Sequence, residues 1–201
     1  MRVRTQGSHD KAGFTLLEIM ITLTLIGLVT GNLYSILGQS SDALSQKTYL
    51  HDTEVQARRT LDRITEALLG ASQSTLYLTP QAPFSTSALN FESNLGVEEG
   101  EVVWSDPERV DLQIKDGQIV WAENPDTKNE RSVIWSRWVP ALLEGEVLSG
   151  EDDNDNGLID EGGLSFELAG NSVIVRLTIE KTSPDGQVFS KTLESVVTCR
   201  N

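Results

Sequence analysis

Apolar residues fill one long stretch near the start of the chain and form different patterns farther along. Residues 14–37 contain a single charged side chain, Glu18, in an otherwise apolar or weakly polar run. A helix needs about 20 predominantly apolar residues to cross a bilayer. The length and composition of this run therefore predict a membrane-spanning helix.

The helical pattern continues beyond this run in amphipathic form. Apolar side chains recur at helical spacing while polar ones occupy the opposite side, as in a helix with one face on a protein core. The apolar positions are Leu50, Ala57, Leu61, Ile64 and Leu68, and the polar ones are Gln56, Arg59, Arg63 and Glu66. Gly70 is a suitable stop signal. We expect one helix over residues 14–70, about 85 Å long if unbroken.

From Ser74 onward the pattern alternates with a period of two, and Pro, Gly, Asn and Asp separate the segments. Such alternation is typical of strands that are half buried. We expect strands at residues 88–92, 101–105, 109–115, 118–123, 131–137, 164–168, 172–181 and 188–198. Turns at Asp116-Gly117 and Pro184-Asp185-Gly186 join neighbours in antiparallel order. The predicted fold class is α+β, with a long N-terminal helix packed on an antiparallel β-sheet head.

All four tryptophans, Trp104, Trp121, Trp135 and Trp138, fall in this strand-rich part. Aromatic side chains of this size contribute large buried areas to a core. We expect them to pack against the apolar stripe of the helix. The alternative is a platform on which bases or sugars stack.

Glu18 is the unusual residue of the apolar run. A carboxylate at this depth costs on the order of 2.5–3.5 kcal/mol or more, and such residues are by default functional and paired. The run contains no cation. Cutting the chain after Gly13 would create an α-amine on Phe14, one helical turn from Glu18. The amine of one chain could then meet the carboxylate of a second chain offset along the helix axis.

Gly13, followed by Phe14-Thr15-Leu16-Leu17-Glu18, stands between a short basic leader and the apolar run. This arrangement resembles the cleavage and methylation signal of type IV prepilins and type II secretion pseudopilins. The resemblance implies that a prepilin peptidase and methyltransferase cuts after Gly13 and methylates Phe14, and that Glu18 directs filament assembly. The competing interpretation is a secretory signal peptide, whose apolar core of about 7–15 residues is shorter and precedes its cut site.

The resemblance implies a chain in four parts. These are a leader at 1–13, a transmembrane and assembly helix at 14–37, its amphipathic continuation at 38–73 and a β-rich head at 74–201. Basic residues near a span are retained in the cytoplasm. We therefore expect a single-pass protein of the bacterial inner membrane, in contact with membrane lipid, with a cytoplasmic N-terminus and a periplasmic head.

Within the family, the layout most resembles a J-type minor pseudopilin of the type II secretion system. The implied partners are other minor and major pseudopilins and, indirectly, an inner-membrane platform with a cytoplasmic ATPase. One alternative is a minor pilin of a type IV pilus or a DNA-uptake filament. Another is a membrane-tethered, calcium-dependent binding module that does not assemble.

The charge and the scarcity of reactive side chains exclude several functions. A formal net charge of −14 repels nucleic acid. The second histidine, His9, lies in the leader, so His51 would be the one histidine after cleavage, and we expect it to be an ordinary surface residue rather than a catalytic base. Cys199 is the only cysteine, so no internal disulfide forms. We expect an inert, partly buried thiol, and the alternative is an intermolecular link. We predict a protein without enzymatic activity.

The acidic loop, residues 150–163, has the residue order of a calcium loop, D-x-N-x-N-G. With Gly157 at the sharp turn, we expect ligands from Asp152, Asn154, Asn156, the carbonyl of Leu158, and Asp160. Gly163 occupies the position at which such loops carry a bidentate glutamate, and Glu161 could fill that role. Asp, Asn and Gly also make up ordinary solvated turns, which is the alternative. We predict a structural Ca²⁺.

Overall fold

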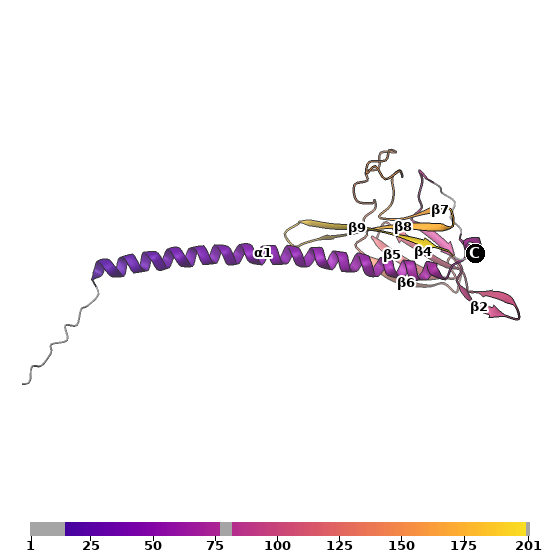
Figure 1. The fold of residues 1–201 in the computed structure, drawn as a ribbon, viewed down its shortest axis with the longest axis horizontal. Coiled ribbons are helices and arrows are strands. Elements are labelled where there is room, and N and C mark those ends of the chain that lie inside the picture. Colours follow the sequence, from indigo (N-terminus) through magenta and orange to yellow (C-terminus); the bar gives the residue numbers. More distant parts are fainter. Residues whose placement is uncertain (1–14, 77–81, 200–201) are drawn as a thin grey trace, which may run out of the picture. The chain divides into compact units, whose positions relative to one another are not determined.

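The computed structural model of the chain describes residues 15–76 and 82–199. Within these residues the chain forms one long helix, α1 (Leu16–Leu69), a short 3-10 helix, η1 (Gln73–Thr75), and nine strands (Figure 1). The strands are β1 (Ala88–Phe91), β2 (Asn94–Glu98), β3 (Glu101–Trp104), β4 (Glu108–Gln113), β5 (Gln118–Glu123), β6 (Arg131–Arg137), β7 (Leu164–Ala169), β8 (Ser172–Thr182) and β9 (Val188–Thr198). The α+β prediction is confirmed.

The chain divides into two compact units, and the division falls inside α1, between Gln46 and Lys47. The first unit contains the apolar part of the helix. The second unit, which we call the head, contains the rest of the helix and all nine described strands.

The strands of the head form three antiparallel groups. Four strands pair in the order β1-β4-β5-β6, β2 and β3 form a separate hairpin, and three strands pair in the order β7-β8-β9. Backbone hydrogen bonds in both directions between Thr86 and Phe166 link the four-stranded and three-stranded sheets. Both expected turns are present, and each contains a glycine with positive φ, Gly117 at +59° and Gly186 at +85°.

One strand was missing from the sequence-based prediction. β2 runs through Gly96, all of its residues are exposed, and its pairing with β3 shifts register between Asn94 and Gly96. A short exposed strand that contains a glycine and a bulge lacks the alternation by which strands are recognised. The β2–β3 hairpin projects from one end of the head and separates β1 from β4 in the sequence (Figure 1).

The core of the head forms where the helix meets the two sheets. Ala57, Ile64 and Leu68 are fully buried and Leu61 is 7% exposed, so this part of the expected stripe is confirmed. The same cluster includes Leu89, Phe91, Val110 and Ile119 from one sheet and Leu164, Phe166, Val173, Val175, Leu177 and Ile179 from the other. The apolar stripe therefore holds both sheets together.

Leu50 is an exception, because it is 50% exposed rather than buried. Near Leu50, the contacts to α1 come from the end of β8 and the start of β9. Phe189 stacks on Tyr49 with ring centroids 5.7 Å apart, and Lys181 pairs with Asp52 at 2.5 Å. These contacts cover one side of the helix and leave Leu50 uncovered.

The expectation that all four tryptophans pack against the core is correct for Trp121 and Trp135 and wrong for Trp104 and Trp138. Trp121 and Trp135 stack at 6.1 Å and are only partly buried at the margin of the core. Trp138 is 51% exposed, with the Lys181 ammonium 4.4 Å from its ring centroid, and Trp104 lies half buried on the β2–β3 hairpin. Aliphatic residues and phenylalanines occupy the interior positions instead.

Replacing a residue of the buried stripe tests this packing. We expect Leu68→Ala to lower the free energy of unfolding by ~2–5 kcal/mol, because it leaves a cavity among fully buried neighbours. The matched control, Leu50→Ala, removes the same atoms from a half-exposed site and should cost less than ~1 kcal/mol. Urea unfolding of the detergent-solubilised chain, followed by tryptophan fluorescence, measures both. Equal costs for the two variants would contradict the packing described here.

Candidate functional site

The first candidate site is the apolar part of α1. Between Leu16 and Leu37, every large apolar side chain is exposed around the whole circumference of the helix, from 49% for Ile19 to 82% for Tyr34. Among the described residues, α1 is long and apolar enough to cross a membrane. Its most apolar stretch has a mean hydropathy of 1.8. A helix that is apolar on all sides is suited to a lipid surrounding rather than to water.

The polar side chains in this stretch are mostly satisfied by the helix itself. The hydroxyls of Thr22, Thr24 and Thr30 each donate to the carbonyl four residues earlier at 2.7–2.8 Å. The side-chain amide of Asn32 donates to the Leu28 carbonyl at 3.0 Å. Internal hydrogen bonds of this kind reduce the cost of placing polar atoms in hydrocarbon.

Glu18 lies in the first turn of this helix and is exposed. Its backbone N–H donates to the Thr15 hydroxyl at 3.3 Å, which caps the start of the helix. Among the described residues, no ion pair involves its carboxylate. Gly13 and Phe14, the expected cleavage and methylation positions, lie outside the described residues.

The acidic loop in the head is the second candidate site. Three of its expected ligands turn toward the backbone of the loop. Asp152 accepts hydrogen bonds from the N–H groups of Asn156 and Gly157 at 3.1 and 2.7 Å. Asn154 accepts one from Asn156 N–H at 3.1 Å, and Asn156 accepts one from Leu158 N–H at 2.9 Å. The alternate side chains of the D-x-N-x-N-G sequence therefore gather on one side of a tight turn.

Asp160 holds the loop to the segment before it. Its carboxylate accepts hydrogen bonds from the N–H groups of Ser149 and Gly150 at 2.9 and 3.0 Å. Asp153 accepts from Val147 N–H at 3.3 Å and from the Ser149 hydroxyl at 2.8 Å. These bonds close the two ends of the loop onto each other.

Glu161 is the most deeply buried acid of the loop, with no exposed surface. One carboxylate oxygen accepts a hydrogen bond from the Asn156 side-chain amide at 2.6 Å. The other oxygen, Oε2, is buried without a hydrogen-bond partner in the described part of the chain. An ionised carboxylate in this situation pays a large desolvation cost.

A second buried acid, Glu146, lies beside Glu161. It is 8% exposed, its Oε1 accepts a hydrogen bond from Asn154 N–H at 3.2 Å, and its Oε2 is also without a partner. Burial and the nearby charge of Glu161 raise the pKa of Glu146 above its ordinary value. Sequence reasoning missed Glu146 because it lies outside the D-x-N-x-N-G pattern, and only the fold brings it to the loop.

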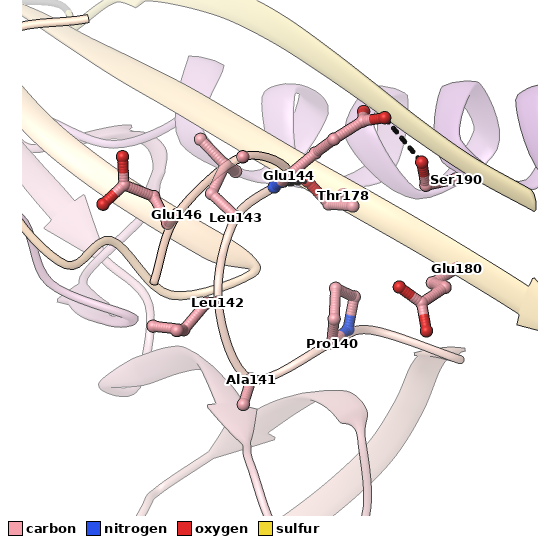
Figure 2. Close-up of a pocket in the computed structure, with 10 residues that line it drawn as sticks. Pro140, Ala141, Leu142, Leu143, Glu144, Glu146, Thr178, Glu180 and Ser190 are labelled. Carbon is pink, nitrogen blue, oxygen red and sulfur yellow. Dashed lines mark hydrogen bonds between the residues drawn. The ribbon is translucent and has the colours of Figure 1, made fainter. Parts of the chain in front are cut away.

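The chain around Glu146 is attached firmly to the sheet. Glu144 accepts hydrogen bonds from the hydroxyls of Ser190 on β9 at 2.5 Å and Thr192 at 2.7 Å, and these bonds lower its pKa. Figure 2 shows Glu144 reaching toward Ser190 across an open pocket, while Glu146 extends to the other side of the same segment. The segment also bonds to the loop, since Leu143 N–H donates to the Glu161 carbonyl at 2.9 Å.

Gly163 explains why the loop departs from the usual calcium pattern. A Cβ atom at this position would lie 2.2 Å from the carbonyl oxygen of Pro140, so no side chain fits there. The bidentate glutamate of such loops is therefore excluded by packing. Glu161 and Glu146 are the carboxylates that lie near the loop instead.

The described residues contain no group of three His, Cys, Asp or Glu side chains that converge as metal ligands. A cation at the loop would need neutral oxygens from asparagines and carbonyls in addition to the two glutamates. His51 is exposed on α1, as expected of a surface residue. Cys199 is buried, and burial raises the pKa of its thiol, which disfavours the reactive thiolate form.

Comparison with known proteins bears on the N-terminal segment. Residues 8–31 match the family model described as the prokaryotic N-terminal methylation motif, and the match spans Gly13, Phe14 and Glu18. No curated protein and no solved structure matches the chain. Such a motif implies processing by a prepilin peptidase and assembly with other pilin-like subunits. The chain thus carries the N-terminal methylation motif of type IV pilin-like proteins at the start of one helix of membrane-spanning length.

Proposed function

We propose that the chain is a minor pseudopilin, a non-catalytic structural subunit that helps to initiate or cap the inner-membrane pseudopilus of a type II secretion system. The observation that carries this proposal is Glu18. It is an exposed acid without an ion pair in the described part of the chain, it lies on an otherwise apolar helix, and it is part of the methylation motif.

The physical basis of assembly is the cost of Glu18 in lipid. An isolated carboxylate is poorly satisfied there, and the apolar run supplies no cation. After cleavage, the methylated α-amine of Phe14 in a neighbouring subunit would be a suitable partner. Because the two groups are one helical turn apart in each chain, pairing between chains favours one axial offset over others.

The head supports a minor role in the filament. It is a strand-rich domain, and it exposes the β2–β3 hairpin, whose side chains Leu95 and Val97 are about two-thirds exposed. In the proposed role the head contacts other minor and major pseudopilins. Because Glu18 is retained, we place the subunit beneath the tip, in the position of a J-type minor pseudopilin. A platform with a cytoplasmic ATPase would move the complex.

The same motif is compatible with a minor pilin of a type IV pilus or of a DNA-uptake filament. Neighbouring genes distinguish these systems. Secretin and pseudopilin genes accompany a type II secretion system, whereas genes for a retraction ATPase or for competence accompany a pilus or a DNA-uptake filament. A membrane-tethered binding module differs in mechanism, since its helix would serve only as an anchor. The role of Glu18 separates this module from both filament proteins.

The filament proposal predicts that Glu18→Leu remains in the membrane but is not incorporated into filaments or cross-linked subunit complexes. The change removes the charge while it keeps the helix apolar, so anchoring should be unaffected. The matched control is Glu66→Leu, which removes an exposed acid from the same helix within the head. Membrane fractionation followed by cross-linking in the native host measures both properties. Incorporation of Glu18→Leu at the wild-type level would favour the tethered module.

Processing gives a second prediction. The protein extracted from the membranes of its native host should have the mass of a chain that begins at Phe14 and carries one added methyl group. Intact-protein mass spectrometry makes the measurement, and a strain without the prepilin peptidase is the control that should retain residues 1–13. A chain cut beyond the apolar run would contradict the proposal, because that product would lack Glu18.

A further inference from the structure

The buried pair Glu146 and Glu161 has two carboxylates but no cation in the described part of the chain. None of the ion pairs among these residues includes either side chain. Each carboxylate has one oxygen hydrogen-bonded to the acidic loop and a second oxygen that is buried and unpartnered. Two like charges close together out of water destabilise the fold unless a positive ion or a proton neutralises them.

We propose that this pair and the acidic loop together bind one Ca²⁺. The ligands are the unpartnered oxygens of Glu146 and Glu161, with further, neutral oxygens from Asn154 and Asn156 and from the Leu158 carbonyl. Asp152, whose two oxygens accept hydrogen bonds from Asn156 and Gly157 N–H, shapes the turn. This proposal is independent of the filament role, since it concerns the head alone.

The hydrogen bonds of the loop indicate how the ligands are brought together. Glu146 bonds to the backbone of Asn154, and Glu161 bonds to the side chain of Asn156. Both buried acids therefore contact the alternate residues that turn inward in the loop. Asp160 is already occupied by the N–H groups of Ser149 and Gly150, so it holds the loop closed around the site.

The chemistry of the ligands favours calcium over other divalent ions. Every candidate ligand is an oxygen, and no cysteine or histidine lies among them. Transition metals prefer nitrogen or sulfur ligands, whereas Ca²⁺ accepts six to eight carboxylate, amide and carbonyl oxygens in irregular geometry. Mg²⁺ requires a near-ideal octahedron and keeps several of its waters, which suits a site with two buried carboxylates poorly.

The ion would stabilise the long connection between β6 and β7. On one side of the site, Leu142 pairs with Gly162, and Glu144 is bonded to β9. The loop itself, from Ser149 to Gly163, forms no helix or strand among the described residues. An ion bound by Glu146, Glu161 and the loop would therefore fix an irregular segment onto the sheet β7-β8-β9.

Calcium titration of the detergent-solubilised full chain, stripped of metal by a chelator, tests the proposal. We expect Ca²⁺ to raise the melting temperature by several degrees and Mg²⁺ at the same concentration to have much less effect, since a ligand that binds only the folded state stabilises it. No rise with Ca²⁺, or an equal rise with Mg²⁺, would overturn the calcium proposal.

Two substitutions assign the site. Glu161→Gln and Glu146→Gln remove ligand charge while they keep the size of the side chain, and each should weaken Ca²⁺ affinity by more than ~10-fold in calorimetric titration. Because they also relieve repulsion, neither should lower the melting temperature of the metal-free chain. The control is Glu151→Gln, which neutralises an exposed acid of the same loop and should bind Ca²⁺ like the wild type. Equal binding by all three variants would overturn the assignment of Glu146 and Glu161 as ligands.

Discussion

The packing of the α1 stripe from Ala57 to Leu68 against two sheets is the contact on which the head depends. Neither sheet encloses a core by itself, because each presents one apolar face, and the helix supplies the surface that both faces share. The backbone link between Thr86 and Phe166 aligns the sheets beside this helix.

The exposure of the apolar side chains changes along the length of α1. Up to Leu37 its apolar side chains are exposed on all sides, and in the head its apolar residues form one buried stripe opposite a polar face. Glu18 and Glu54 both lie on α1, but their neighbours differ. Glu54 pairs with Arg58 at 2.9 Å, and this bond lowers its pKa. Glu18 has no such neighbour in the described chain, and the proposed assembly with another subunit would supply one.

The connection between β6 and β7 shows how a fold can concentrate charge that it does not neutralise. Glu144 is stabilised by two hydroxyls on β9, and Asp160 by two backbone N–H groups. Glu146 and Glu161 each lack such support at one oxygen. The proposed cation would neutralise both of these carboxylates.

The sequence by itself determined the features that depend on local spacing. Uninterrupted apolar character indicated the membrane-length helix, period-two alternation located eight of the nine described strands, and the residues from Gly13 to Glu18 indicated the processing motif. These signals are readable because a helix or a strand repeats its side-chain direction at a fixed interval. β2 escaped because its glycine and bulge remove that regularity.

Only the tertiary structure decided which distant residues meet. It placed Glu146 beside Glu161, excluded a side chain at Gly163 through the Pro140 carbonyl, and left Leu50 and Trp138 exposed. No periodicity encodes such contacts, since they depend on how sheets, helix and loops are arranged in three dimensions.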